Sequence, residues 1–483
     1  MPNVRAAVVL SALSQYSVSI VQIVTMLILA RLLTPAEIGV FAIASGVIML
    51  ATFLRELGVT QYIIREEEIT DAKIRAATGV MMLSSWTLGA LIAFAAPYIA
   101  HFYGEPELAE VLWVCVLAFL LAPFASVPFA VLTRNLQFGP LFHIGLAAAL
   151  TNSVCAIGLV WFGMSYMGLA WASIAGAVVQ LVAIIHYTDK RIPVGPSLRH
   201  ANEILKFGII AVGGTVLRRL SPNLPDLILG RVATMNDVGI FSRGFGAVLF
   251  LNELCIQALK PVVLPYLSSV HRDGQSVADA YRRACVLQTA VTWPMCAGVN
   301  LLALPMILLL FGEQWRDAAP LATIIALWGA LQAVHCFASD ALLAVGKEMT
   351  MLVMETVLFV TRLSVLLIAA PHGLEAVAWA LVLTAGIELI VGSCAVYSGF
   401  GLGMLSMLRA LVPSAFVAVT CWTCVWVSLN GLAQVELDGT LAMFISVVIC
   451  GPVWLASLFL SRHPLADEVK RFLASRLGWM SAV

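Results

Sequence analysis

The amino-acid sequence predicts an all-α polytopic membrane protein of about fourteen transmembrane helices. We expect two parallel-repeat six-helix lobes followed by a C-terminal helix pair. Three observations support this prediction: apolar runs of membrane-spanning length fill the chain, basic residues gather in every second connecting segment, and a stretch near residue 30 recurs 200 residues later.

The composition indicates that a bilayer is the solvent. Of the 483 residues, 61% are hydrophobic and 11% are charged, whereas about 25% are charged in an ordinary soluble domain. The mean hydropathy is +0.97. Lys plus Arg and Asp plus Glu each number 27. The absence of net charge therefore gives no indication of a nucleic-acid partner.

The apolar runs, separated by charged, Gly or Pro turns, predict spans that average the length needed to cross about 30 Å of hydrocarbon. The expected spans are 6–32, 38–60, 77–100, 108–132, 141–163, 166–187, 205–230, 236–260, 284–311, 318–345, 349–370, 374–398, 410–430 and 439–460. The first run is longer than the apolar part of a signal peptide and shows no cleavage pattern, so we expect it to be kept as a helix. Two links are tight, at Gly163-Met164-Ser165 and at Gly346-Lys347-Glu348.

The positions of Lys and Arg predict the sidedness of the chain. If the N-terminus lies inside, twenty Lys and Arg fall in inner segments, and Arg31, Arg231 and Arg316 fall outside. Basic residues are retained on the cytoplasmic side. We therefore expect both termini in the cytoplasm.

An internal repeat divides the chain. Residues 27–42 align without gaps with residues 227–242, with identity at seven of sixteen positions, including Gly39 with Gly239. A second match pairs Pro97, Gly104 and Glu105 with Pro305, Gly312 and Glu313. Because each half has an even number of helices, the repeats are parallel, and such halves enclose a cavity near the midplane.

The repeat and the charge pattern together predict five parts. They are an N-terminal six-helix lobe at 1–190, a cytoplasmic linker at 191–204, a C-terminal six-helix lobe at 205–400, a helix pair at 401–460 and an amphipathic cytoplasmic tail at 461–483. The tail places its apolar residues on one helical side, which is typical of a helix that lies on the inner leaflet.

All ten cysteines lie within or at the edge of apolar segments, where cysteine acts as a small hydrophobe. Their positions suggest neither a disulfide framework nor a metal site. We find no nucleophile–base pair and no phosphate-binding loop outside the spans, so we expect no enzyme activity and no cofactor. A coupling ion, H⁺ or Na⁺, stays open.

Charged residues within the spans are the candidate functional residues, because each costs roughly 2.5 to 3.5 kcal/mol at the bilayer centre. Adjacent helical residues point about 100° apart, so one of two neighbouring arginines is expected to face a wet cavity. The candidates for a cationic cavity are Arg218, Arg219, Arg243 and Arg362. The candidates for counter-ions or coupling sites are Asp226, Glu253, Asp340 and Glu388, while the first helix contributes the neutral Gln15 and Gln22. Glu355 and Arg362 lie seven residues apart on one helix, where they can pair with each other or with a neighbour.

Three stretches carry a resemblance to a known family. Residues 223–231, Asn-Leu-Pro-Asp-Leu-Ile-Leu-Gly-Arg, with 238–243, Val-Gly-Ile-Phe-Ser-Arg, resemble the second-half signature of the polysaccharide transporters, the Wzx-like oligosaccharide flippases. Residues 310–320 and 31–39 resemble two further segments of that family. The family belongs to the superfamily that also holds multidrug extruders and lipid II flippases. The first helix lacks the acid typical of the extruders and the charged pair of the lipid II flippases.

The resemblance implies a flippase that moves an undecaprenyl-pyrophosphate-linked oligosaccharide across the bacterial inner membrane by alternating access, for surface or exopolysaccharide synthesis. The arginine fork matches phosphate oxygens in geometry, which suits such a substrate. The implied partners are the polyprenyl-linked oligosaccharide, membrane lipid and the polymerase or glycosyltransferases of the same pathway. Two alternatives remain open: a small-molecule cation antiporter of the same fold, and an assembly protein that has lost transport.

Overall fold

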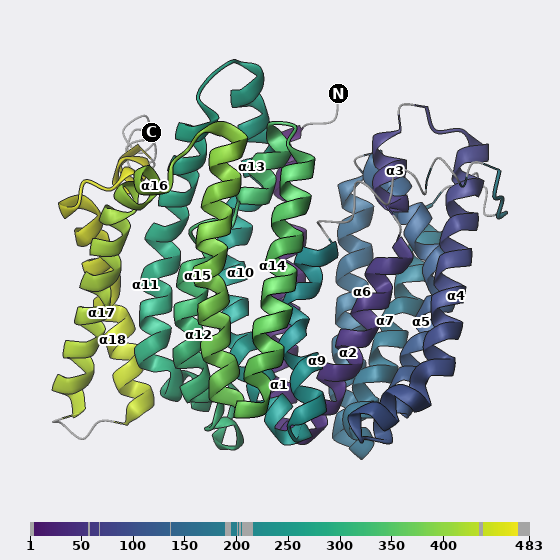
Figure 1. Ribbon diagram of the computed structural model, residues 1–483. Helices are drawn as coiled ribbons and strands as arrows, with labels where there is room; N and C mark the ends of the chain where they lie inside the picture. Colours follow the sequence, from purple (N-terminus) through teal and green to yellow (C-terminus); the bar gives the residue numbers. More distant parts are fainter. Residues whose placement is uncertain are drawn as a thin grey trace, which may run out of the picture. The chain divides into compact units, whose positions relative to one another are not determined.

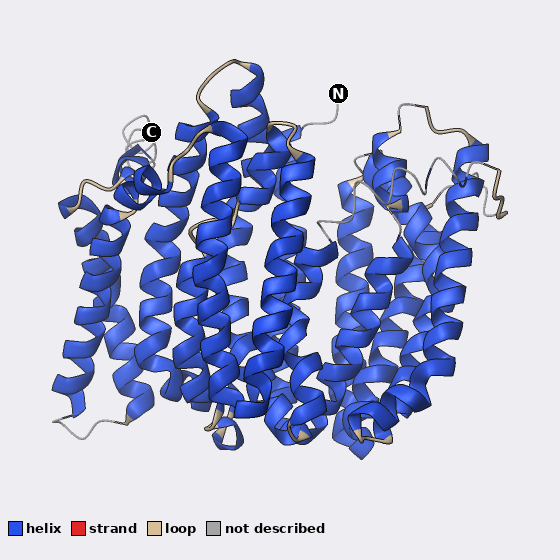
Figure 2. Ribbon diagram, viewed as in Figure 1, coloured by secondary structure: helices blue, strands red, loops and turns tan. Residues whose placement is uncertain are grey.

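The computed structural model is helical throughout the part of the chain that it describes, and that part contains no strand (Figure 2). The described residues are 4–56, 58–66, 68–135, 137–188, 195–199, 201, 204, 216–433 and 438–471. The chain divides into two compact units, Met1–Gly239 and Ile240–Val483. Each unit is described by itself below.

The first unit is a bundle of long helices. Its helices are α1 (Val4–Leu32), α2 (Pro35–Glu56), α3 (Val59–Arg65), α4 (Asp71–Tyr103), α5 (Glu107–Arg134), α6 (Phe138–Leu159), the π-helix η1 (Val160–Met164), α7 (Ser165–Tyr187), η2 (Ser221–Asn223) and α9 (Leu224–Val232). Neighbouring pairs are α4 with α5, α6 with α7, α5 with α7, and α1 with α6. The short α9 packs against α2. Figure 1 shows α4 and α5 side by side.

The second unit is also a helical bundle. Its helices are α10 (Met235–Arg272, beginning in the first unit), α11 (Val277–Phe311), η3 (Glu313–Trp315), α12 (Ala318–Gln332), α13 (Ala338–Ala344), α14 (Glu348–Ala369), η4 (Ala370–His372), α15 (Leu374–Phe400), α16 (Met404–Ala410), α17 (Val412–Ala433) and α18 (Gly439–Leu460). α17 and α18 pack on each other and on α11, as Figure 1 shows. α15 packs on α12 and α14.

Ten helices in the described ranges are long and apolar enough to cross a membrane. One of these, Phe138–Tyr187, is a hairpin of α6 and α7, turned at Gly163 (φ 87°) and Ser165 (φ 50°), where the sequence predicts a tight link. Two shorter apolar helices cover Tyr16–Leu32 and Ala318–Gln332. The multi-pass, all-helical class is confirmed. The count of fourteen and the arrangement in lobes stay predictions.

The expected span 318–345 is not one continuous helix. α12 ends at Gln332, five residues follow without regular helix, and α13 begins at Ala338. Hydropathy could not show this break, because the residues of the break are as apolar as their neighbours apart from His335. Irregular backbone at membrane depth persists where protein covers it or where it lines a wet cavity. Here protein covers it, since Phe337 and Ala338 are buried in the core of the second unit.

The linker expected at 191–204 is described only at 195–199, 201 and 204, and 472–483 of the expected tail lie outside the described residues. The described part of the linker packs on α4: the backbone N–H of Ser197 donates to the carbonyl of Arg75 at 3.0 Å. Residues 216–239, expected in the second lobe, belong to the first compact unit. The expected boundaries of the five parts stay predictions.

The two sequence repeats occupy equivalent local structures. Thr34 and Glu37 form a capping box at the start of α2, with the Thr34 backbone N–H donating to Glu37 Oε2 at 2.7 Å. Thr234 and Asp237 form the same box at the start of α10, where the Thr234 N–H donates to Asp237 Oδ2 at 3.2 Å. Such a box satisfies backbone N–H groups that a helix start leaves unbonded.

The second repeat shows the same equivalence. Gly104 ends α4 with φ 76°, and Gly312 ends α11 with φ 101°. Positive φ at a helix end favours glycine, which has no Cβ to clash with the preceding carbonyl. Both glycines therefore end a helix with positive φ, although ψ differs, at 15° for Gly104 and 174° for Gly312.

Candidate functional site

Arg219 lies alongside α2 within the first unit, and Arg218 precedes it in the chain. Following the segment forward from Arg219, its residues meet α2 in reverse order. The guanidinium of Arg219 lies over the ring of Phe53, 5.5 Å from its centroid, and the Asn223 side-chain amide contacts Met49 Sδ at 3.2 Å. Arg219 and Asn223 are four residues apart, as are Phe53 and Met49, and four residues make about one helical turn. The segment thus runs antiparallel to α2, with Arg219 near the last turn of α2.

A third arginine belongs to the same level of the first unit. Arg55 lies two residues beyond Phe53 in the last turn of α2, and its guanidinium lies 5.0 Å from the ring centroid of Phe119. Its Nε is buried and has no hydrogen-bond partner among the described residues. The loop charges predict that Arg55 is one of the cytoplasmic cations. Hydropathy cannot show that an arginine at a helix end packs on an aromatic ring, so the sequence does not predict the contact with Phe119. Cation–π contact leaves the guanidinium edge available to an anion.

The other polar candidates of the first unit lie on other helices. Asp226 is half-buried in the first turn of α9. Gln22 of α1 is exposed, and the side chain of Gln15 lies outside the described residues. The roles expected for these three residues stay predictions.

Arg243 belongs to the second unit and lies against two aromatic rings. Its guanidinium carbon is 5.6 Å from the centroid of Phe311 and 5.3 Å from that of Trp315. Its Nε has no hydrogen-bond partner in the described part of the chain. Glu253 lies ten residues further along α10, about three turns away, so it is not a direct partner of Arg243 on that helix.

A buried polar network surrounds the break between α12 and α13. His335, which is 7% exposed, contacts the hydroxyl of Tyr281 on α11 through Nδ1 at 2.8 Å and the hydroxyl of Ser393 on α15 through Nε2 at 2.9 Å. The Tyr281 ring stacks on the imidazole of His335. Gly392 on α15 leaves room for this imidazole, since a Cβ at that position would lie 3.2 Å from the ring. Hydrogen bonds to two neighbouring helices, α11 and α15, thus hold the break in place. Sequence reasoning missed this network, because a single histidine in an apolar run carries no pattern.

The remaining charged candidates of the second unit bond across helices. Arg362 on α14 donates to Glu388 Oε2 on α15 at 3.1 Å, and Ser339 on α13 donates to Glu355 Oε1 on α14 at 2.5 Å. Glu355 and Arg362 are expected from the sequence to pair with each other or with a neighbour. These bonds show that each pairs with a residue of a neighbouring helix. Asp340 is 9% exposed and lies next to Ser339 at the start of α13.

The four candidate arginines therefore do not form one group within either unit. In the first unit Arg219 lies over Phe53 and Arg55 lies over Phe119. In the second unit Arg243 lies against two aromatic rings, and Arg362 bonds to Glu388. Arg55 and Arg219 thus lie at the same turn of α2 but on different sides of it, because residues 53 and 55 of a helix point about 200° apart. Glu56 is the adjacent acid on α2. Guanidinium forks bind phosphate oxygens bidentately.

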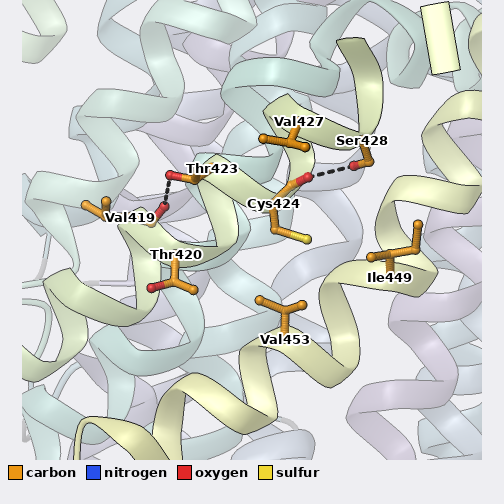
Figure 3. Close-up of a pocket in the computed structure, with 8 residues that line it drawn as sticks. All are labelled: Val419, Thr420, Thr423, Cys424, Val427, Ser428, Ile449 and Val453. Atoms are coloured by element: carbon orange, nitrogen blue, oxygen red, sulfur yellow. Dashed lines mark hydrogen bonds between the residues drawn. The ribbon is translucent and has the colours of Figure 1, made fainter. Parts of the chain in front are cut away.

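An apolar groove lies on α17 and α18 (Figure 3). Its volume is about 640 Å³, and its walls include Val419, Val427, Ile449 and Val453. The hydroxyls that line it are used locally, as in the Ser428 bond to the carbonyl of Cys424 at 2.7 Å that Figure 3 draws. The groove offers hydrocarbon-like surface and suits an apolar chain better than a charged group.

The helices of the two units define a multi-pass membrane protein. Residues 28–320 match the family described as polysaccharide biosynthesis protein, and the chain belongs to this family. The resemblance stated from the sequence is confirmed.

Curated relatives are similar over most of the chain. The chain is 25% identical over 322 residues to the succinoglycan biosynthesis transport protein ExoT of Rhizobium meliloti, covering 66% of this chain and 64% of ExoT, slightly less than two thirds of that relative. It is 22% identical over 469 residues to the lipopolysaccharide biosynthesis protein WzxC of Escherichia coli, covering 93% of this chain and 92% of WzxC. The chain is thus a membrane protein of polysaccharide biosynthesis.

Solved structures share the fold. The lipid II flippase MurJ, in an inward closed conformation, superposes with a TM-score of 0.76 at 14% identity, covering 94% of this chain and 99% of MurJ. An inward-facing multidrug resistance MATE family transporter of the MOP superfamily superposes with a TM-score of 0.64 at 16% identity, covering 79% of this chain and 95% of that one. At these identities the likeness concerns the fold alone.

Proposed function

We propose that this protein is a flippase that moves an undecaprenyl-pyrophosphate-linked oligosaccharide from the inner to the outer leaflet of a bacterial inner membrane. The product serves surface or exopolysaccharide synthesis, and transport proceeds by alternating access. The family supports a role in polysaccharide biosynthesis. The fold shared with a lipid II flippase makes a lipid-linked substrate chemically sensible.

The observation that supports this proposal is the position of Arg219, which follows Arg218 in the chain and lies over Phe53 in the last turn of α2, the turn that also holds Arg55. The loop charges predict that the end of α2 faces the cytoplasm. A pyrophosphate at the inner leaflet meets these guanidinium groups at its own depth, while its polyprenyl chain stays in the bilayer. Two phosphates carry several acceptor oxygens, which matches several guanidinium forks better than one.

The test compares Arg219→Ala with Arg231→Ala in a strain that depends on this gene for its polysaccharide. Each arginine lies over a phenylalanine, Arg219 over Phe53 at 5.5 Å and Arg231 over Phe102 at 5.2 Å, so the pair is matched in local contact. Arg231 lies at the opposite end of the segment. Loss of a charge-assisted hydrogen bond of roughly 1.5 to 3 kcal/mol should lower export about tenfold or more.

We expect Arg219→Ala and Arg55→Ala to reduce surface polysaccharide and to raise the cellular pool of lipid-linked oligosaccharide, at normal protein levels in the membrane. Arg231→Ala should leave both quantities unchanged. Undiminished polysaccharide in Arg219→Ala and Arg55→Ala would show that these arginines do not bind the pyrophosphate. Export of small cations with no change in the lipid-linked pool would favour the antiporter. Absence of both transport activities would favour the assembly protein.

A further inference from the structure

The starts of α2 and α10, which the sequence repeat makes equivalent, touch each other through their glycines. A Cβ placed on Gly39 would lie 2.0 Å from the carbonyl oxygen of Met235, and one placed on Gly239 would lie 1.8 Å from the carbonyl oxygen of Pro35. Pro35 and Met235 are themselves 200 positions apart, as are the two glycines. The contact is therefore reciprocal, and it needs glycine on both sides.

The electrostatics of this contact are also reciprocal. Two helix starts meet here, and each carries the partial positive charge of its unbonded N–H groups, so they repel. Glu37 caps one start and Asp237 caps the other, which places one carboxylate on each. Ser165 also donates to Glu37. The two acids neutralise the repulsion that close approach would otherwise cause.

The contact is suited to opening and closing. A Cα packed on a carbonyl oxygen contributes a small attraction that disappears within a fraction of an ångström, so separation breaks no strong bond. The two backbones also approach closely, since one methyl group on either glycine would prevent this contact.

We propose that the contact of 35–39 with 235–239 is the outer gate of the transporter, closed in this structure. The loop charges place both segments on the outer side of the membrane. The proposal rests on the alternating-access function proposed above: the segments lie together while the substrate enters from inside and separate when it leaves to the outer leaflet.

Accessibility of a reporter cysteine tests the gate without any transport measurement. Val238 is fully buried. In whole cells, Val238→Cys should react slowly with a membrane-impermeant maleimide, above the background of the ten native cysteines measured in the parent protein. Adding Gly39→Ala should raise its labelling rate several-fold, because the new Cβ holds the segments apart.

The control is Gly158→Ala, a helical glycine of the same unit whose Cβ would meet nothing within 4 Å. It should leave the labelling rate of Val238→Cys unchanged. Equal rates in the Gly39→Ala and Gly158→Ala proteins would overturn the gate.

A second experiment keeps both glycines, so it does not depend on the folding of Gly39→Ala. Ala36 and Asn236 are equivalent in the repeat, and both lie in the first turn of their helices. A bifunctional maleimide should join Ala36→Cys to Asn236→Cys, as detected by mass spectrometry of the linked peptides, and should stop polysaccharide export. A monofunctional maleimide should not stop it. Failure to form the link, or continued export by the linked protein, would overturn the gate.

The two proposals fail separately. Faster labelling in Gly39→Ala together with normal polysaccharide in the Arg55 and Arg219 variants supports the gate and rejects the pyrophosphate site. Reduced polysaccharide in the arginine variants together with unchanged labelling rejects the gate and leaves the substrate proposal in place.

Discussion

Individual residues of the second unit show how buried charge is tolerated. The ion pair of Arg362 and Glu388 joins α14 to α15 with side-chain exposures of 9% and 19%. A buried pair is rarely a net source of stability, because desolvation cancels most of the attraction, but removal of one partner leaves a buried charge without compensation. Loss of one of the two residues should therefore destabilise the protein more than loss of both.

This dependence predicts a non-additive mutant cycle. Arg362→Met and Glu388→Leu should each destabilise the protein by about 3 to 5 kcal/mol, whereas the double variant should be close to the parent. Thermal unfolding in detergent measures the three changes. The exposed pair of Arg316 and Glu313 is the control, and its single variants should change little. Additive losses at Arg362 and Glu388 would contradict the interpretation.

A histidine outside the spans should make stability depend on pH. His463 follows α18, and its Nδ1 accepts from the backbone N–H of Leu465 at 3.0 Å while its Nε2 contacts the hydroxyl of Ser414 at 3.0 Å. Burial lowers the pKa of His463 to about 4 from its ordinary value of 6.5. Between these two pH values the unfolded chain binds a proton that the folded chain does not. Stability should therefore fall as the pH drops through this window.

Thermal unfolding in detergent between about pH 7 and about pH 5 measures this effect. His463→Gln should flatten the dependence relative to the parent, because the glutamine does not titrate. The exposed His372 supplies the control, and His372→Gln should keep the slope of the parent. The same slope in the parent and in His463→Gln would show that other groups set the pH dependence.

At the scale of elements, tryptophans bond two of the backbone carbonyls that prolines leave without a partner inside helices. Proline lacks the N–H that would bond the carbonyl four residues earlier. Pro294 leaves the carbonyl of Ala290 without this bond, and the indole N–H of Trp454 on α18 donates to it at 2.9 Å. In α4, Pro97 likewise leaves the carbonyl of Ala93, which accepts from the indole of a tryptophan on α5 at 2.9 Å. The bonds also tie each interrupted helix to a neighbour.

This repair predicts coupling between Trp454 and Pro294. Trp454→Phe leaves the Ala290 carbonyl without its donor and should cost roughly 1 to 3 kcal/mol. In a Pro294→Ala background the restored backbone N–H bonds the carbonyl, so the same change should cost less. Thermal unfolding of the four proteins measures the difference. An equal cost of Trp454→Phe in both backgrounds would show that only the packing of the ring matters.

At the scale of the whole molecule, the sequence repeat predicts a duplicated chain. The two sequence matches lie on capping boxes at the starts of α2 and α10 and on positive-φ glycines at the ends of α4 and α11. Local turn chemistry is therefore preserved, while the charges differ between the halves. The duplicated frame explains why equivalent segments can meet reciprocally at Gly39 and Gly239.

The expected topology of this frame can be measured with reporter insertions. A phosphatase inserted after Met164, in the hairpin of α6 and α7, should be active because this turn is expected outside. The same insertion after Lys347 should be inactive, and a fluorescent protein fused there should fold in the cytoplasm. The reverse pattern would invert the orientation that the loop charges predict. The same reporter state at both positions would contradict the count of spans between them.

The sequence by itself determined the membrane class, most helix positions and the family, because hydropathy, turn residues and motifs are properties of the linear chain. It also predicted a duplication and made Arg218 and Arg219 site candidates, and both stay predictions. Only the tertiary structure decided that Arg55 lies over Phe119, that Arg362 pairs with Glu388, that a helix breaks around His335 and that Gly39 meets Gly239. These features depend on which helices pack together and at what height. Packing is set by contacts between distant segments, which no local period encodes.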